Sequence, residues 1–458
     1  MAITQGGTTA PSRGRRSGER AIVVGAGIAG MSAAFRLHQQ GFDVTVLEAE
    51  ADIGGRMSSV EQDGFTMNRA ANILPASYKA IRGLADEVGI GDQLGRMDGA
   101  IATLRDGRIR RLRSDHLVGD GIRTDLLSWR SKLKARRLLV DALRMRSSLS
   151  YENLGLAARF DVETAAEYCR RRLNDELREY LVDPVLRALF GADAERVSVV
   201  DFFFAAVNFI GSGFMQYPGG IDFLVRALAE HVEVQVGARV HEVRHDGRDV
   251  TVEWEQAGQQ HVASCTACVI AVSGPLVPAL YPQLDATQRR ILSEDLEYAS
   301  LFNAHIGLSA VPDEPALIVQ VPRSEHPGLC VVTFDHNSSP TLVPPGKGKL
   351  SAYWLASWCE ERFDWTDEAL FEEMFPAIDK VVPGVRSMVE TTRIDRWRPA
   401  VLMSRPGTYA AVAELVRRID PTTPVQLAGD YLSASSTNGC AVSGELAAAR
   451  LAAQEVTT

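Results

Sequence analysis

The sequence has few cysteines, no excess of positive charge and no long hydrophobic run. Six cysteines in 458 residues are too sparse for a disulfide-stapled secreted domain, so we expect a reducing, cytoplasmic location. The net charge of −9 disfavours a general nucleic-acid binder, because phosphate neutralisation needs a basic surface. No apolar run approaches the ~18–20 residues that span a bilayer, which excludes a bundle of transmembrane helices.

The composition is that of a globular protein, with 46% hydrophobic and 23% charged residues. A chain of 458 residues is long enough for roughly two to four domains. Residues 1–19 are rich in Ser, Thr, Gly and Arg and lack an apolar pattern, so we predict a disordered tail there.

The most informative pattern is a strand, a glycine-rich turn, a helix and a second strand. An apolar β-branched run over 21–24 is followed by glycines with G-x-G-x-x-G spacing and by small and apolar residues at helical intervals. Gly41 ends the predicted helix, and the second strand, 43–47, ends at Glu48. This order is the context in which the glycine pattern predicts dinucleotide binding rather than a tight turn alone.

Each residue of the pattern has a physical role. Gly25 permits the tight turn, Gly27 allows the backbone to approach a pyrophosphate, and Gly30 allows the helix to pack closely on the sheet. Ile28 and Ala29 begin the helix, where free N–H groups and the positive end of the dipole favour phosphate. Glu48 is placed to accept hydrogen bonds from a ribose diol.

A second glycine pair favours a flavin over a nicotinamide cofactor. Ala49 follows the ribose-binding acid, and Gly54, Gly55 and Arg56 come shortly after it. The glycines let a second backbone segment close over the pyrophosphate, and the guanidinium adds a fixed, bidentate cation. The arrangement resembles the flavin-containing amine oxidase superfamily, which includes monoamine and polyamine oxidases, protoporphyrinogen oxidases and phytoene-type desaturases.

The resemblance extends to later segments of the chain. Residues 217–231 are similar to the family's return to the flavin domain, and 234–243 to a strand whose Val240 contacts the adenine through its backbone. Residues 425–430 resemble the second phosphate-and-ribityl motif, and the segment after it resembles the helix that points at the isoalloxazine. In the last two segments the resemblance implies cofactor contacts for Gly429, Asp430, Asn438, Gly439 and Val442. Trp397 resembles the family's aromatic residue near the return to the flavin domain, which implies a contact with the cofactor edge.

The resemblance implies an α/β fold with two domains. A Rossmann-like FAD-binding domain is expected over 20–95, 215–290 and 390–458, and an α+β substrate-binding domain with a mixed sheet over 96–214 and 291–389. Residue patterns predict strands within 291–310 and 349–357, and helices over 126–147, 161–182, 222–231 and 366–381.

The family's substrate-side groups are changed in this chain. The lysine that holds a water near flavin N5 in amine oxidases falls at Asn303, and the tyrosine of their aromatic cage falls at or near Ser436. No cysteine lies between 360 and 439, so we expect non-covalent FAD. These departures make simple amine oxidation less fitting than chemistry of the porphyrinogen oxidase or desaturase kind.

Asn303 and His305 are the candidate catalytic residues. They alternate on one predicted strand, so their side chains share a face. Asn303 can hydrogen-bond a substrate or a water, and His305 can act as a base. The alternative is that both are structural residues whose polar groups are hydrogen-bonded at the boundary between the two domains. This alternative is favoured for His305.

Three further features have ordinary structural explanations. Trp397 fits a cofactor edge or a core position equally well, and the aromatic residues of 202–217 favour core over a substrate pocket. Cys265 and Cys268 lie in an apolar run, 262–272, that reads as one strand, on which the two sulfurs point to opposite faces. They are therefore predicted to be buried rather than to bind zinc.

The helix predicted over 126–147 is basic and amphipathic. We expect its basic side to be exposed to solvent. Docking on an acidic membrane surface and steering of an anionic substrate are the alternatives.

Together these features predict an FAD-dependent oxidoreductase of the amine oxidase superfamily. It would dehydrogenate a C–N or C–C bond of a small to medium, largely apolar substrate by hydride transfer to flavin N5, with O2 or another acceptor reoxidising the flavin. The alternatives are a protoporphyrinogen-oxidase-like or polyene-desaturase-like enzyme, a non-oxidative flavin-dependent mutase or isomerase, and a redox-silent FAD-binding module. No nucleic-acid partner or metal is expected, and the oligomeric state stays open, with a dimer among the options.

Overall fold

Five parallel strands from three distant parts of the chain form one sheet in the computed structural model, which describes residues 18–97, 99–113, 117–209 and 211–454. The predicted tail over 1–19 lies outside these ranges except for residues 18 and 19. Across the sheet the strands are β10 (Glu233–Gln235), β2 (Asp43–Leu47), β1 (Arg20–Val24), β14 (Ala267–Ile270) and β22 (Val425–Leu427).

Both faces of this parallel sheet are buried, which explains its β-branched, apolar strands. On β1, Ala21 and Val23 pack into one hydrophobic cluster, and Ile22 and Val24 pack into another on the opposite face. The second cluster also contains residues of the antiparallel sheet β11 (Ala238–Asp246), β12 (Asp249–Gln256) and β13 (Gln259–Cys265).

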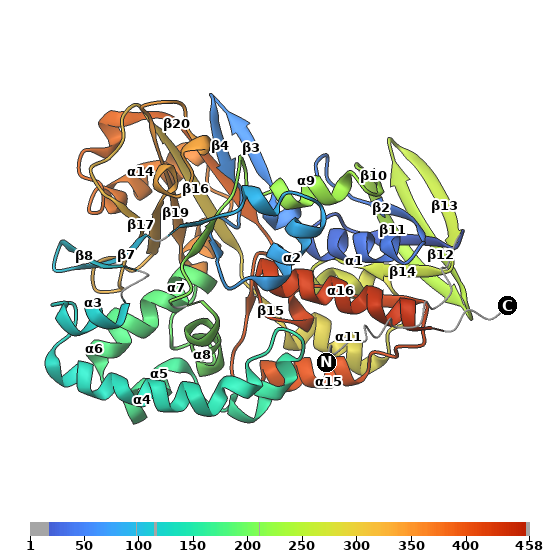
Figure 1. Ribbon diagram of the computed structural model, residues 1–458, viewed down its shortest axis with the longest axis horizontal. Helices are drawn as coiled ribbons and strands as arrows, with labels where there is room; N and C mark the ends of the chain where they lie inside the picture. The colour runs from blue at the N-terminus through green and yellow to red at the C-terminus, as the bar shows by residue number, and fades with distance from the viewer. Residues whose placement is uncertain (1–17, 98, 114–116, 210, 455–458) are drawn as a thin grey trace, which may run out of the picture.

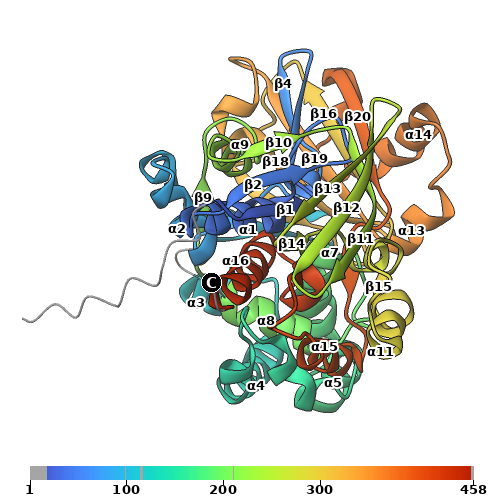
Figure 2. The same ribbon diagram turned by 90° about the vertical axis from the view of Figure 1, so that its right-hand side faces the viewer.

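Helices α1 (Ile28–Gln39) and α16 (Thr437–Ala453) lie side by side on the parallel sheet (Figures 1 and 2). They approach so closely that a Cβ on Gly444 would lie 2.0 Å from the carbonyl oxygen of Ala29. The small residue at this crossing brings the first and the last helix of the fold together.

A second sheet contains seven strands and stands apart from the first (Figure 1). Across the sheet they are β20 (Val389–Trp397), β16 (Leu301–Leu308), β19 (Gly348–Trp354), β18 (Leu329–Phe334), β17 (Ala316–Gln320), β7 (Ala100–Arg105) and β8 (Arg108–Arg113). All neighbours are antiparallel except β17 and β7. This mixed sheet and the α/β content agree with the predicted fold class.

The two faces of the mixed sheet differ in character. On β16, Phe302, Ala304 and Ile306 belong to a hydrophobic cluster that also contains residues of α14 (Asp367–Ile378). Asn303 and His305 therefore share the other face, as the strand period predicts.

A group of helices lies below the mixed sheet in Figure 1. It comprises α3 (Leu117–Arg123), α4 (Trp129–Met145), α5 (Ala165–Arg172), α6 (Asp175–Leu177), α7 (Asp183–Phe190) and α8 (Val199–Asn208). The other helices are α2 (Lys79–Glu87), α9 (Phe223–Ala229), α10 (Val277–Leu280), α11 (Ala286–Arg290), α12 (Asp335–Ser338), α13 (Ala356–Glu361) and α15 (Thr408–Arg417). Short strands pair as β3 (Ser59–Gln62) with β4 (Phe65–Asn68), β15 (Glu297–Tyr298) with β21 (Leu402–Met403), and β9 (Phe214–Gln216) with β5 (Leu74–Pro75) and β6 (Gly95–Met97).

Several predicted elements need correction. The stretch 291–310 begins with a π-helical turn, Ile291–Asp295, and only its later part forms β15 and β16. The predicted helix over 161–182 is broken at Leu173, whose φ and ψ of −119° and −130° are not helical. The predicted strand over 262–272 is two strands in different sheets, β13 and β14, with Cys265 in one and Cys268 in the other.

Both of these cysteines are buried, as expected. Among the described residues, no group of three or more Cys, His, Asp or Glu side chains is arranged to hold a metal ion. In the same part of the chain, no helix has the length and apolar character needed to cross a membrane.

Candidate functional site

A cavity of about 420 Å³ lies where the first turns of α1 and α16 meet the mixed sheet and the helices α7 and α8. Its apolar lining consists mainly of Ile73, Ile101, Val185, Ala188, Leu189, Phe190, Ala205, Phe209, Phe214, Leu301, Ile318 and Val331. This size and lining are typical of a small-molecule site. Among the described lining residues, Arg56 and Asp430 are the charged ones.

The glycine-rich turn forms one wall of the cavity. Gly25 has a φ of +102°, and a Cβ on Gly30 would lie 1.9 Å from the carbonyl oxygen of Gly25, so both positions require glycine. Gly27, Ile28 and Ala29 line the cavity. Because α1 begins there with no side-chain cap and no acidic residue in its first turn, its free N–H groups favour an anion.

The second glycine pair lies directly beside this turn. Gly54 forms a parallel bridge with Gly27, and its N–H donates to the carbonyl of Ala26 over 2.9 Å. Gly54 and Gly55 have φ values of +104° and +54°, which glycine adopts most readily. The two segments thus present adjacent backbone at the cavity.

Glu48 directly follows β2, beside the same turn. One carboxylate oxygen accepts from the N–H of Ala26 over 2.7 Å, and the other accepts from the N–H of Glu50 over 2.9 Å. The carbonyl of Glu48 accepts from Ala238, which joins the segment of Ala49 to β11. Val240 lies on β11 at a bulge, where the pairing with β12 shifts between Val240 and Glu242.

Arg56 and Asp430 form an ion pair at the cavity wall. Arg56 Nη1 lies 2.7 Å from Asp430 Oδ2 and also donates to the carbonyl of Ala400 over 2.6 Å. The other carboxylate oxygen of Asp430 accepts from the hydroxyl of Tyr298 over 2.7 Å. Burial opposes the charge of Arg56, but Asp430, Cys440 and Tyr298 together outweigh burial and raise the pKa of Arg56.

Gly429 lies next to this pair and also lines the cavity. Its N–H donates to Ser443 Oγ over 2.9 Å. A Cβ there would lie 2.4 Å from the ring of Tyr431, so the close packing at the end of β22 requires glycine.

The start of α16 brings Ser436, Thr437 and Cys440 to the cavity. Ser436 caps the helix by accepting from the N–H of Gly439 over 3.0 Å. Thr437 Oγ1 is buried and has no hydrogen-bond partner among the described residues. An orphaned hydroxyl in a cavity wall fits a polar group of a bound ligand.

The three predicted cofactor residues of α16 lie outside the cavity lining. Asn438 is buried, and its side-chain oxygen accepts from the N–H of Ala80 over 3.0 Å. It therefore caps helix α2, whose own cap residue, Tyr78, makes no side-chain cap bond. None of Asn438, Gly439 and Val442 lines the cavity, because helical periodicity turns them away from it.

Asn303 and Trp397 both line the cavity. Asn303 Nδ2 donates to the carbonyls of Arg69 (2.6 Å) and Ala70 (3.2 Å), and Trp397 Nε1 donates to the carbonyl of Arg69 over 3.1 Å. No described group donates to Asn303 Oδ1. Asn303 therefore has an acceptor available within the cavity.

The structure argues against the expected catalytic role of His305. It is fully buried, does not line the cavity, and lies 3.0 Å from Ser351 Oγ through Nδ1. Burial, reinforced by Lys349, lowers the pKa of His305 to about 3. It is a neutral part of a buried polar cluster, so the structural alternative fits this residue better than a catalytic base.

The predicted aromatic stretch divides between core and cavity. Phe202, Phe203 and Phe204 are buried in a hydrophobic cluster, as expected, whereas Phe209 and Phe214 line the cavity.

Sequence reasoning missed the polar residues that line the cavity from other elements, namely Asn72, Tyr78, Gln320, Thr333 and Tyr353. They share no spacing along the chain, so no local pattern marks them.

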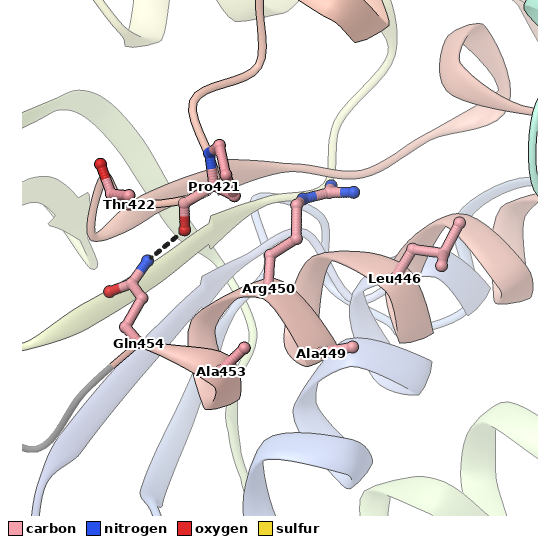
Figure 3. A pocket seen from close by; sticks show the side chains of 7 residues that line it. All are labelled: Pro421, Thr422, Leu446, Ala449, Arg450, Ala453 and Gln454. Atoms are coloured by element: carbon pink, nitrogen blue, oxygen red, sulfur yellow. Dashed lines mark hydrogen bonds between the residues drawn. The ribbon is translucent and has the colours of Figure 1, made fainter.

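A second hollow lies on the outside of α16, away from this cavity (Figure 3). Arg450 is its charged residue, and this guanidinium is committed to Gln426 Oε1 (2.6 Å) and the carbonyl of Leu427 (3.3 Å). Gln454 likewise donates to the carbonyl of Pro421 over 2.9 Å. The polar groups here join α16 to its neighbours and do not converge on a ligand.

Comparison with known proteins places the chain in a family. The family model described as "Flavin containing amine oxidoreductase" matches residues 28–452. Over 42% of the chain, the sequence is 31% identical to the mitochondrial protoporphyrinogen oxidase of Nicotiana tabacum, but this alignment covers only 37% of that enzyme. Coproporphyrinogen III oxidase of Bacillus subtilis is 20% identical over 92% of this chain and 94% of its own.

Solved structures share the fold. Cyclohexylamine oxidase from Brevibacterium oxydans IH-35A has a TM-score of 0.76 and 18% identity, covering 95% of this chain and 98% of its own. The matched family confirms the resemblance derived from the glycine, arginine and aspartate motifs. The chain belongs to the flavin-containing amine oxidoreductase family.

Proposed function

We propose that this protein binds FAD non-covalently and dehydrogenates a C–N or C–C bond of a small to medium, largely apolar and uncharged substrate. When bound, the flavin supplies the chemistry by accepting a hydride at N5, and we infer that O2 reoxidises it. The observation that carries the substrate class is the cavity lining, whose two charged residues, Arg56 and Asp430, neutralise each other.

Three features support FAD as the cofactor. Adjacent backbone at Gly27 and Gly54, with the uncapped start of α1, suits a pyrophosphate. Glu48 at the tip of β2 suits a ribose diol. At the far end, the orphaned hydroxyl of Thr437 suits a polar edge of the flavin. We assign the contacts predicted for Gly25, Ala49, Val240 and Gly429 to the same cofactor.

We also propose the predicted division of labour between domains. The strands of the parallel sheet come from 20–95, 215–290 and 390–458, and we assign these segments to FAD. The helices α3 to α8 and the strands of the mixed sheet other than β20 (Val389–Trp397) fall within 96–214 and 291–389, and we assign these to the substrate. The predicted boundary at residue 390 is therefore too early, because β20 pairs with β16 in the mixed sheet.

The lack of unpaired charge in the lining favours some substrates over others. A protonated amine in this cavity would need a carboxylate partner, and a carboxylated tetrapyrrole would need cations, because a buried unpaired charge is costly. Asp430 is already paired with Arg56 and Tyr298. Desaturation of an uncharged, apolar molecule therefore suits the cavity better than oxidation of a cationic amine.

The lining residues act by position. The apolar side chains of α7 and α8 exclude water and hold the substrate by burial. Asn303 Oδ1 accepts a hydrogen bond from a water or from a polar group of the substrate. Its amide nitrogen is anchored on two backbone carbonyls, so the acceptor is held in one orientation.

The cysteine at the cavity supports a dissociable cofactor. Burial, with Asp430 nearby, raises the pKa of Cys440 to about 12. The thiol is therefore protonated at neutral pH, and a protonated thiol is a poor nucleophile.

The test is a spectroscopic titration followed by anaerobic reduction. We expect purified protein to be yellow, to release its flavin on acid precipitation, and to regain colour with FAD. Uncharged apolar candidates should bleach it faster than cationic amines or carboxylated tetrapyrroles. Protein that stays colourless with excess FAD would refute the cofactor assignment, and preferential bleaching by a cationic amine would refute the substrate class.

A further inference from the structure

Helix α4 carries an apolar stripe on the side that faces away from the protein. Trp129, Leu133, Val140 and Leu143 are 69%, 52%, 54% and 71% exposed. At about 100° per residue, these four side chains fall within an arc of about 80°. Leu139, 67% exposed, lies at the edge of this stripe.

The opposite side of α4 already packs on the protein. Ser131 and Met145 are buried, and Ala135, Leu138 and Ala142 pack on a hydrophobic cluster. A helix on a protein surface normally turns polar residues outward. The outer stripe departs from this rule, because its apolar side chains are more than half exposed and no described residue covers them.

Arginines lie along one border of this stripe and within it. Arg130, Arg137 and Arg144 follow one border of it, and Arg136 lies within it. Arg130 and Arg136 form no ion pair with a described residue. We call this set of exposed apolar and arginine side chains the α4 outer face.

Acidic side chains are missing from the α4 outer face. The acidic residue of α4, Asp141, is buried and accepts from the hydroxyl of Tyr168 over 2.7 Å and from Arg172. It also lies 3.9 Å from Arg144, whose side chain is 74% exposed. The face is thus locally basic on a chain whose net charge is −9.

We propose that the α4 outer face docks on an anionic lipid surface, with α4 lying in the plane of the interface. Apolar residues along one arc with flanking arginines are the pattern of an interfacial helix. Arginine stems can cover apolar surface while their guanidinium groups reach lipid phosphates, and tryptophan prefers the interfacial region. A second copy of the chain fits less well, because a symmetric contact would place two sets of arginines against each other.

The proposal is independent of the flavin chemistry and can be tested by vesicle flotation of the full-length protein. We expect it to float with vesicles of phosphatidylcholine mixed with phosphatidylglycerol, but not with phosphatidylcholine alone. Binding should weaken between about 0.1 M and about 1 M salt, because the Debye length falls from roughly 10 Å to 3 Å.

Two sets of variants separate the apolar and basic contributions. Arg136→Gln and Arg144→Gln should each weaken binding about fivefold, the effect expected for one basic residue near an anionic surface. Leu143→Gln should weaken it about tenfold through lost apolar burial. Val262→Gln on β13, where the side chain is also well exposed, is the matched control and should bind as the wild type does.

Each outcome decides the proposal. Unchanged thermal unfolding of the variants, together with lost flotation, supports it. Equal flotation with neutral vesicles, or no flotation with anionic ones, overturns it. Concentration-dependent dimerisation that Leu143→Gln abolishes, without lipid binding, would assign the face to a second copy instead.

Discussion

Arg56 and Asp430 are 374 residues apart in the chain, yet Arg56 Nη1 lies 2.7 Å from Asp430 Oδ2. The pair ties the turn that follows β2 to the end of β22, and it does so at the wall of the cavity. Because these two charges neutralise each other, the cavity offers a bound molecule neither a free cation nor a free anion.

The first prediction concerns this ion pair. Asp430→Asn should lower the free energy of unfolding by about 2 kcal/mol, because it leaves Arg56 without an anion. The cost is below that of a fully buried pair, since the Arg56 side chain is 31% exposed. Urea unfolding measures it. Asp52→Asn, which breaks an exposed contact with Arg226, should change the free energy by less than about 0.5 kcal/mol.

The second prediction concerns the glycine turn. Gly27→Val should abolish flavin binding but leave the protein folded, because the nearest obstacle to a Cβ there is the carbonyl of Gly54, 3.9 Å away. The visible spectrum and circular dichroism measure the two effects. Gly83→Val, at a site where a Cβ meets nothing within 4 Å, should stay yellow. A normal flavin content in Gly27→Val would contradict the assignment.

The third prediction separates flavin binding from folding at Thr437. Thr437→Val removes a buried hydroxyl that has no described partner, so the flavin-free protein should become more stable by up to about 1 kcal/mol. The same change should weaken FAD binding about fivefold, because a hydrogen bond to the cofactor is lost. Thermal unfolding with and without FAD shows both effects. If both forms shift by the same amount, Thr437 does not contact the cofactor.

The fourth prediction separates Asn303 from His305. Asn303→Leu should slow flavin reduction by about fivefold, because the substrate or a water loses a hydrogen-bond acceptor worth roughly 1 kcal/mol. His305→Gln should leave this rate unchanged, since His305 does not line the cavity. Stopped-flow reduction with a substrate from the anaerobic screen measures both. A large rate loss in His305→Gln, with normal flavin content, would restore the catalytic reading of His305.

The fifth prediction concerns pH. Burial, opposed by Tyr409 and assisted by Asp161, raises the pKa of Asp201 from its ordinary 3.8 to about 8. The folded state therefore holds a proton that the unfolded state releases, so this contribution to stability is complete below about pH 4 and is lost as the pH rises towards 8.

Asp201→Asn is the matched variant for this effect. It keeps an oxygen that can accept from the hydroxyl of Tyr409 but cannot ionise. Urea unfolding between pH 5 and pH 8 should show the wild type losing up to about 1.4 kcal/mol per pH unit through this group, with a shallower slope in the variant. Parallel slopes would mean that Asp201 is ionised in the folded protein.

The local part of the site could be predicted from sequence. The turn at Gly25 and Gly30 and the position of Glu48 lie within one strand–helix–strand unit, where spacing along the chain fixes direction in space. The same reasoning correctly placed Asn303 and His305 on one face of a strand.

Spacing does not determine what covers that face. Asn303 opens to the cavity, whereas His305, two residues along, lies under Ser351 and Asp395. These partners come from β19 and β20, which pair with β16 only in the tertiary structure.

The motifs of this chain by themselves determined the glycine-rich turn between strand and helix, the acidic residue after the second strand, and the likeness to a flavin-dependent family. The tertiary structure alone decided that Asn438 caps α2, that Cys265 and Cys268 belong to different sheets, and that the apolar stripe of α4 faces outward. The physical reason is that backbone geometry is set by near neighbours, while burial and charge pairing depend on segments hundreds of residues away.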